Sequence, residues 1–277
     1  MGKVIAVCTS DRKGLQKHDV NTAHFSVEWG IDGDAHAGSW HRQVSLLSAD
    51  KIEAFNKRGA NVIPGAFGEN LVVEGFDFRA LPVGTLLRCG DVLLEMTQIG
   101  KECHSHCEIY KKMGECIMPR EGVFARVIEP GSISVGDEMS IEKREWHFPW
   151  QAAVITLSDK AAAGERKDES GPAIAKRLRE ASYEVVEEIV IPDDERVLKQ
   201  QLIRLCDQRQ LDLILTTGGT GCSARDITPE ATIAIADKNV PGIAEAMRAE
   251  SLKITRHAMI SRAASVIRGK TLIINLP

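Results

Sequence analysis

Residues 215–232, LTTGGTGCSARDITPEAT, leave an apolar strand through a glycine-rich turn and then enter a helix. The glycines permit positive φ and lack the Cβ atom that would hold a ligand away from the backbone amides. We expect Thr228 to cap the helix and Pro229 to occupy its first turn. The turn matches neither of the common glycine-rich phosphate motifs, so a phosphate-binding loop and a tight structural connection are both open interpretations.

Strands and helices alternate around this turn. The apolar runs AAVITLS at 152–158 and LDLILTT at 211–217 alternate with amphipathic segments such as DERVLKQQLIRLCDQ at 194–208. That order predicts a mostly parallel sheet covered by helices, with ligands beyond the carboxyl ends of the strands. We therefore expect residues 151–277 to form an α/β domain whose ligand site includes the glycine-rich turn.

Two aspartates accompany this predicted sheet edge. Asp226 follows the glycine-rich turn, and Asp193, in IPDDE, follows another predicted strand. A carboxylate beside an anion site repels the ligand unless it binds a divalent cation or orients a positive group, so a magnesium role is one interpretation. The alternatives are that Asp226 pairs with Arg225 or caps the next helix, and that IPDDE is only a helix start.

Residues 152–276 resemble the molybdopterin-binding domain of molybdenum-cofactor biosynthesis, the family of bacterial MogA and of gephyrin. The resemblance runs through ITLSDKAAAGERKDESGP, IPDDE, LTTGGTGCSARDITPEAT, VPGIAEAMR, SLKIT and IRGKTLIINLP. It implies a three-layer α/β fold, a homotrimer, and an enzyme that adenylylates molybdopterin with Mg-ATP. Such a transfer needs the pterin phosphate in line with the α-phosphate of ATP, and it requires no protein nucleophile.

The same resemblance implies roles for individual residues. Asp193 and Asp226 would be the catalytic acidic pair that binds magnesium near the reacting phosphates. The implied ligand-contacting positions are Gly218, Gly219, Thr220, Gly221, Ser158, Asp159, Asp168 and Ser170. Ser170 would serve equally well as the cap of the helix that begins GPAIAKRL.

Members of this family usually continue beyond INLP with a further loop and helix, whereas this sequence stops at Pro277. We expect either an incomplete sequence or a domain that lacks part of its ligand wall or oligomer surface. A noncatalytic carrier that stores or delivers molybdopterin is therefore the alternative to an adenylyltransferase.

The first half of the chain has a different pattern. Short β-rich runs, such as GTLLRCG at 84–90 and DVLLEMTQI at 91–99, are separated by glycine. This predicts a mostly β, barrel-like domain over residues 1–143. Residues 144–150 combine charge, aromatic rings and proline, and we expect them to be the linker to the α/β domain.

One early helix is expected within the β-rich half. The segment ADKIEAFNKRG at 49–59 places Ile52 and Phe55 on one face, and Gly59 is a suitable helix end.

Most of residues 1–141 resemble a MOSC domain, the module shared with molybdenum-cofactor sulfurases. The likeness rests on GIDGDAHAG, RQVSLLS, FGENL, GTLLRCGDVLLEMTQIGKEC and REGVFARVIEPGSISVGD. It implies that Cys103 carries sulfur or contacts the metal cofactor as a thiolate, with a sulfur donor and molybdoenzymes as partners. A buried, apolar cysteine is the structural alternative.

The segment KECHSHCEIYKKMGEC at 101–116 supports another hypothesis. Cys103, Cys107 and Cys116, interleaved with two histidines, are enough soft ligands for zinc or an iron–sulfur cluster, although the spacing matches no standard finger. Sulfur transfer, metal binding and redox pairing are all open interpretations of this segment.

Several cationic side chains of this half are candidates for binding a phosphate or a molybdate-type oxyanion. Arg42, Arg120 and Arg126 offer paired guanidinium donors, and structural ion pairs are their alternative role. His36, His41, Asp32 and Asp34 surround a glycine-rich turn that would bind an anionic cofactor or form a polar hairpin.

Size and composition agree with two ordinary globular domains. The chain has 277 residues, 43% hydrophobic and 27% charged, and its formal charge of −4 argues against nucleic acid as a partner. It contains no apolar run of membrane-spanning length and no N-terminal secretion pattern, so we expect a cytoplasmic protein. Seven cysteines in such a chain are expected to be reduced.

Overall fold

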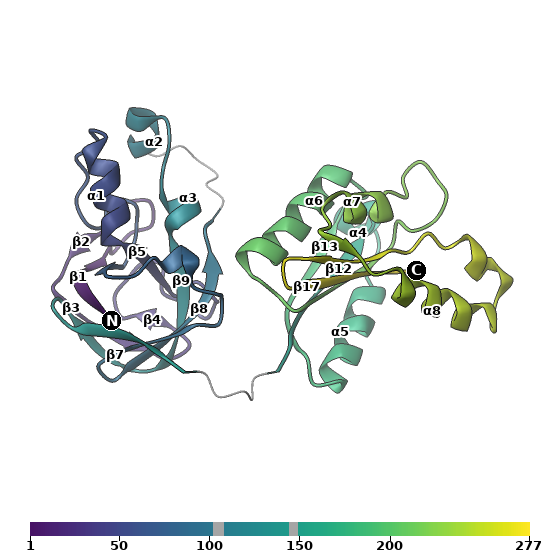
Figure 1. Cartoon of the computed structure of the whole chain (residues 1–277), viewed down its shortest axis with the longest axis horizontal. Helices are drawn as coiled ribbons and strands as arrows, with labels where there is room; N and C mark the ends of the chain where they lie inside the picture. The colour runs from purple at the N-terminus through teal and green to yellow at the C-terminus, as the bar shows by residue number, and fades with distance from the viewer. Residues whose placement is uncertain (102–107, 144–148) are drawn as a thin grey trace. The chain divides into compact units, whose positions relative to one another are not determined.

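The computed structural model describes residues 1–101, 108–143 and 149–277. The chain divides into two compact units, Met1–Glu145 and Trp146–Pro277 (Figure 1). Within the described residues, every helix is too short or too polar to cross a lipid bilayer. Cys103 and Cys107 lie outside the described residues.

The first unit is mostly β. Its strands are β1 (Gly2–Thr9), β2 (His18–Asp19), β3 (Thr22–Ser26), β4 (Gly30–Ile31), β5 (Val44–Ser48), β6 (Leu71–Glu74), β7 (Leu86–Cys89), β8 (Val92–Ile99), β9 (Val123–Glu129), β10 (Gly131–Ser134) and β11 (Glu138–Glu142). Its helices are α1 (Ala49–Lys57), η1 (Phe78–Ala80), α2 (Glu108–Met113) and α3 (Met118–Glu121).

These strands form a closed β-barrel, as the sequence predicts. Eight strands follow the order β11-β7-β8-β9-β5-β6-β1-β2, and β11 also pairs with β1, which closes the sheet. A smaller antiparallel sheet has the order β10-β3-β4. Inward residues from neighbouring strands, such as Val44, Leu94 and Ala125, are fully buried in one apolar cluster. Truncating a buried leucine in such a core costs about 2–5 kcal/mol.

The predicted early helix is confirmed as α1. Ile52 and Phe55 are buried against β5 and β6. Gly59 follows the helix with φ of +93°, the left-handed conformation of a helix end.

The second unit alternates strands and helices. Its strands are β12 (Gln151–Leu157), β13 (Glu184–Ile191), β14 (Leu213–Thr217), β15 (Lys238–Asn239), β16 (Ser265–Arg268) and β17 (Thr271–Leu276). Its helices are α4 (Asp159–Ala162), α5 (Ser170–Glu180), α6 (Glu195–Ile203), the π-helical turn η2 (Arg204–Gln208), α7 (Thr228–Ala234), α8 (Pro241–Leu252) and the short 3-10 helix η3 (Arg256–Ile260).

Its six-stranded sheet has the order β13-β12-β14-β17-β16-β15. The first four strands are mutually parallel. Strand β16 runs antiparallel to β17, and β15 runs antiparallel to β16. Successive residues of β12 face opposite sides: Ala153 joins an apolar cluster with α6 and α7, and Val154 joins another with α5. Figure 1 shows α5 on one side of the sheet and α6 and α7 on the other.

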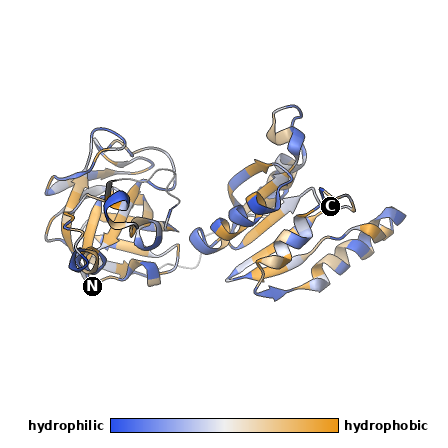
Figure 2. Ribbon diagram, turned by 90° about the horizontal axis from the view of Figure 1, so that it is seen from above, coloured by the Kyte–Doolittle hydropathy of each residue, from blue (hydrophilic) through white to orange (hydrophobic). Residues whose placement is uncertain are grey.

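Hydropathy follows this arrangement. Figure 2 shows apolar strands inside both units and mixed helices whose hydrophilic residues alternate with apolar ones. The parallel strands β12 and β14 are almost wholly buried, as strands covered on both faces should be. Their carboxyl ends bring Ser158 and Gly218 to one edge of the sheet.

The predicted Thr228 cap is wrong, and so is the cap role that Ser170 had as an alternative to a ligand contact. Thr228 is the first residue of α7 and makes no cap; its hydroxyl donates instead to the Gly218 carbonyl at 2.9 Å. Ser170 does not cap α5, because the Asp168 carboxylate accepts the Ser170 and Gly171 amides, each at 3.1 Å. Pro229 lies in the first turn of α7 as predicted.

Candidate functional site

The glycine-rich turn connects β14 to α7 at the carboxyl edge of the parallel sheet. Gly218 and Gly219 have φ of +96° and +65°. A Cβ at Gly218 would lie 2.4 Å from the Leu157 carbonyl oxygen, and one at Gly219 would lie 2.4 Å from the Thr228 hydroxyl oxygen. Both the conformation and the close packing therefore require glycine at these two positions.

Asp159 and Asp193 join the ends of β12 and β13. The Asp159 amide donates to Asp193 Oδ2 at 3.2 Å, and the Asp193 amide donates to Asp159 Oδ1 at 3.0 Å. Asp193 also lies against the glycine-rich turn, because a Cβ at Gly219 would be 3.6 Å from its Oδ1. The structure thus brings both carboxylates to the edge that the sequence predicts.

Asp226 lies on the other side of the turn. Its Oδ2 accepts the Ser223 amide at 2.7 Å, and a Cβ at Gly221 would lie 2.9 Å from the same oxygen. Hydrogen bonds from Ser223, together with the charge of Arg262, lower the pKa of Asp226, so it is ionised at neutral pH. Arg225 forms its ion pair with Asp159, which removes the predicted alternative of an Arg225–Asp226 pair.

Two further predicted site residues are helix caps. Ser158 Oγ accepts the Ala161 amide at 3.2 Å at the start of α4. Asp168 accepts the Thr156 hydroxyl at 2.8 Å in addition to the two amides of α5. Both lie near the ends of β12, and their contact with a ligand stays a prediction.

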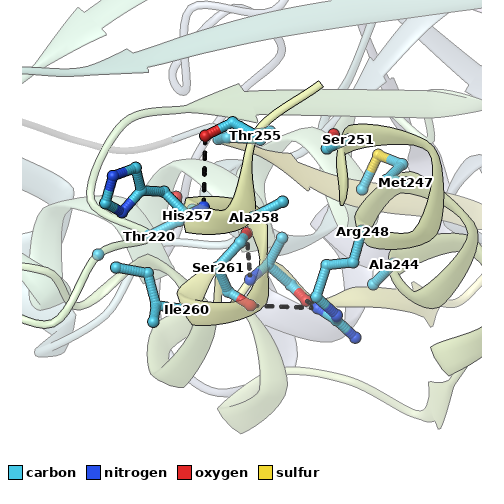
Figure 3. Close-up of a pocket in the computed structure, with 13 residues that line it drawn as sticks. Thr220, Ala244, Met247, Arg248, Ser251, Thr255, His257, Ala258, Ile260 and Ser261 are labelled. Atoms are coloured by element: carbon cyan, nitrogen blue, oxygen red, sulfur yellow. Dashed lines mark hydrogen bonds between the residues drawn. The ribbon is translucent and has the colours of Figure 1, made fainter. Parts of the chain in front are cut away.

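A pocket of about 320 Å³ adjoins the glycine-rich turn (Figure 3). Thr220 and Gly221 line it from the turn, Met247 and Arg248 from α8, and Ser261 from the segment after η3. Further lining residues are Ala244, Ser251, Thr255, His257, Ala258, Ile260, Ala263 and Pro277. The mixture of apolar walls and a few polar groups suits a small organic ligand that carries a polar or charged end.

Sequence reasoning missed Arg262 at this edge and considered Arg225 only as a partner of Asp226. Arg225 pairs with Asp159, and Arg262 contacts the carbonyls of Gly221 and Asp226. The groups that the Arg262 side chain contacts lie 32 to 41 residues earlier in the chain, so no local spacing identifies Arg262 as a site residue. Only the fold brings it to the loop.

In the first unit, the GIDGDAHAG motif forms part of a buried polar cluster. Lys17 Nζ donates to both Asp34 oxygens, at 2.8 and 2.9 Å, and both side chains are 1% exposed. Asp34 also accepts the Ser10 and His36 amides, at 3.1 and 3.2 Å. Burial lowers the pKa of Lys17; for Asp34, the Lys17 contact outweighs burial and lowers the pKa of the carboxyl.

The neighbouring FGENL motif supplies Glu69. Its carboxylate is fully buried and accepts the Gly65 and Phe67 amides, at 2.8 and 3.0 Å. Burial raises its pKa to about 6 despite these hydrogen bonds and the nearby charge of Lys17. Lys17, whose amide donates to Gly65 at 3.1 Å, therefore links the two motif segments.

His36 is half-exposed beside this cluster. Burial, together with the charges of Lys17 and Lys101, lowers the pKa of its imidazole, so it is neutral at pH 7. His41 instead bonds Gln98 at 2.9 Å, and Asp32 accepts the Ser26 hydroxyl at 2.9 Å.

The three arginines predicted to bind an oxyanion lie in different surroundings. Arg42 stacks between the Trp40 and Phe124 rings, 4.6 and 5.5 Å from their centroids. Arg126 pairs with the buried Glu95 at 2.7 Å across β8 and β9, and Arg120 pairs with Glu115 at 3.1 Å. Arg120 and Arg126 therefore make the ion pairs that are their alternative role.

Of the three cysteines in the predicted Cys/His metal site, only Cys116 lies within the described residues. Cys116 is half-buried and packs against the apolar cluster that contains Ile52 and Phe55. Across residues 1–101, 108–143 and 149–277, no three His, Cys, Asp or Glu side chains gather as a metal-binding group.

Comparison with known families assigns the two halves separately. Residues 153–277 match the model described as "Probable molybdopterin binding domain", and residues 33–140 match the MOSC domain. The chain is 44% identical over 126 residues to the molybdopterin adenylyltransferase of Helicobacter pylori, which covers 45% of this chain and 72% of that protein.

Two further matches are as follows. The molybdopterin adenylyltransferase of Escherichia coli K12 is 42% identical over 127 residues, 45% of this chain and 65% of its own length. The crystal structure of the molybdopterin biosynthesis enzyme MoaB from Thermus thermophilus has 44% identity and a TM-score of 0.44, and the match covers 46% of this chain and 80% of that one.

Proposed function

Since the chain belongs to the molybdopterin-binding family and carries a MOSC domain in the same polypeptide, we propose that its second domain adenylylates molybdopterin with ATP. The terminal phosphate of the pterin attacks the α-phosphorus of ATP. A new phosphoanhydride bond forms as the bond to the β-phosphate breaks, and pyrophosphate leaves. Curated relatives named molybdopterin adenylyltransferase support this reaction.

The observation that carries the proposal is the continuity of loop and pocket. Thr220 and Gly221 belong both to the glycine-rich turn and to the pocket wall. A pterin in the pocket would therefore extend its phosphate toward the turn, which has the Asp193 carboxylate beside Gly219 and the Asp226 carboxylate beside Gly221. Holding the two reacting phosphates in line is the main requirement of such a transfer.

Magnesium fits this donor set. Mg²⁺ is usually held by one or two carboxylates together with substrate phosphates. Asp193 and Asp226 provide two carboxylates at the turn, and Asp226 is ionised because its pKa is lowered. Bound there, the ion would relieve charge on the reacting phosphates. Asp159, which orients Asp193 through paired hydrogen bonds, would support this role.

An adenylylation assay with molybdopterin, magnesium and ATP tests the proposal directly. We expect transfer by the native protein and a loss of about 100-fold or more in Asp226→Asn, the scale of removing one preorganised charge-stabilising group. Asp207→Asn is a matched control, because Asp207 pairs with Arg268 on the surface. Pterin binding without transfer would support the carrier alternative instead.

For the first domain we propose that it handles sulfur or the mature cofactor, with Cys103 as the reactive thiol. The support is the match of residues 33–140 to the MOSC domain. Lys101 lies two residues before Cys103 in the sequence, and a cationic neighbourhood stabilises a thiolate. The Cys103 thiolate would attack the outer sulfur of a persulfide donor, so that a new sulfur–sulfur bond forms as the donor's own breaks and the donor thiolate leaves. Mass spectrometry after incubation with such a persulfide donor should detect a persulfide that Cys103→Ser abolishes; an unchanged mass in the native protein would reject this role.

We also propose that the second domain is a three-layer α/β unit that assembles as a trimer. Apolar clusters on both faces of its sheet support the layers. Exposed apolar residues next to the pocket support assembly, since Ile254 is 90% and Met259 65% exposed. Light scattering on the purified chain would test this, and a monomer at micromolar concentration would reject it.

A further inference from the structure

We infer that Arg262 is a positioning residue that holds the loop carrying Asp226 in register with the pocket wall. The inference rests on the proposed adenylyl transfer. It concerns a residue that makes no hydrogen bond to Asp193 or to the Asp226 carboxylate, and whose hydrogen bonds hold the loop backbone. Its charge also helps to lower the pKa of Asp226, and Arg262→Lys keeps that charge.

Arg262 makes its loop contacts with carbonyl groups. Its Nε donates to the Gly221 carbonyl at 2.6 Å and its Nη2 to the Asp226 carbonyl at 2.5 Å. Its own amide donates to the Thr220 carbonyl at 3.2 Å. Arg262 therefore holds both ends of the segment 220–226. Its planar guanidinium spans the two carbonyls in a fixed geometry, whereas a more flexible side chain would hold them less rigidly.

A fourth contact anchors the guanidinium itself. Arg262 Nη1 forms an ion pair with Glu230 on α7, the helix that follows the loop. The guanidinium is thus fixed against α7 on one side and the loop on the other. Because the Arg262 side chain is about one-third exposed, we assign its importance to geometry and not to the strength of the ion pair.

The position of Arg262 in the chain connects this anchor to the pocket. Its neighbours Ile260, Ser261 and Ala263 line the pocket wall. Arg248 on α8 donates to the Ala263 carbonyl at 3.0 Å and so fixes the same segment from the far side. The short segment 260–263 therefore connects the pocket wall, which a bound ligand would contact, to the loop that carries Asp226.

The expected consequence is a separation of binding from transfer. In Arg262→Gln, pterin affinity should change by less than about 3-fold, because the walls from α8 and η3 remain. Transfer should fall by about 100-fold, since a displacement of about 1 Å at the reacting groups has that effect. Arg262→Lys should lose about 10-fold, because an ammonium cannot span both carbonyls as a guanidinium does.

Glu230→Gln tests the anchor, and a second variant provides the control. Glu230→Gln removes the ion pair and leaves both loop carbonyl contacts, so its transfer rate should fall by less than that of Arg262→Gln. Arg256→Gln removes an exposed cationic side chain from η3, six residues earlier, and should behave as native protein.

Hydrogen exchange of residues 218–230 supplies a readout that does not depend on activity. We expect faster exchange of the Ser223 and Asp226 amides in Arg262→Gln and native exchange in Arg256→Gln. If the native protein fails to transfer AMP, the proposed function is rejected. Hydrogen exchange would still show whether Arg262 holds the loop. Unchanged exchange in Arg262→Gln, or equal loss of pterin binding and transfer, would overturn the positioning role.

Discussion

The charged side chains of the two polar centres of this protein differ in solvent exposure. In the first unit, Lys17 and Asp34 are 1% exposed and satisfy each other. In the second unit, Asp159 and Arg225 pair at side-chain exposures of 47% and 64%, beside backbone turns that glycine keeps bare. Charges that saturate one another inside a core specify structure, whereas charges at an open sheet edge remain accessible to a ligand.

The largest expected effect comes from breaking the buried pair. Lys17→Met leaves the buried Asp34 carboxylate without its cation, and the free energy of unfolding of the first unit should fall by about 3–5 kcal/mol. Urea denaturation of the native and variant chains measures this. Arg225→Gln, which removes one partner of the exposed pair, should cost at most about 1 kcal/mol. Equal costs in the two variants would contradict the comparison.

The pH dependence of stability gives a second, smaller test. Burial raises the pKa of Glu69 to about 6, above the ordinary value of about 4.3 in an unfolded chain. The folded state therefore holds the proton more tightly, so this group's contribution to stability is present at low pH and is lost as pH rises from about 4.3 to about 6. The loss amounts to about 2 kcal/mol.

Glu69→Gln isolates that contribution. The variant should lack this fall between about pH 4.3 and pH 6, whatever its absolute stability, because glutamine does not titrate. Denaturant unfolding of both chains at several pH values measures the slope. The same fall in both proteins would assign it to other groups. Asp226, with a lowered pKa, contributes in the opposite direction, and its exposure keeps that contribution small.

The sequence predicts the open centre better than the buried one. Alternating strands and helices predict the parallel sheet, and the connection after a strand end predicts where Gly218 and Asp193 meet. Those signals are local, since each depends on a few consecutive residues. Lys17 pairs with a residue 17 positions away, and Arg262 reaches back 41 positions to the Gly221 carbonyl. Such long-range contacts are set by tertiary packing and leave no periodic trace.

The caps show the same limit at shorter range. Thr228 and Ser170 have the right residue types at helix starts, yet the Thr228 hydroxyl donates to Gly218 and the Asp168 carboxylate caps α5. Several polar groups compete for each free amide or carbonyl, and the packed loop decides which one wins. Residue type therefore predicts that a cap exists more reliably than which side chain provides it.

The last test separates backbone conformation from close packing in the open centre. Gly219→Ala introduces a Cβ 2.4 Å from the Thr228 hydroxyl oxygen at φ of +65°, whereas Gly164→Ala introduces one into open space at φ of +76°. Both variants incur the left-handed penalty, about 1 kcal/mol at the low end. Only Gly219→Ala must also displace Thr228 and with it the hydroxyl contact to Gly218. Thermal unfolding should show the larger loss in Gly219→Ala, by about 1 kcal/mol beyond the Gly164→Ala value. Equal losses would mean that the fold needs glycine at this position only for its backbone angles.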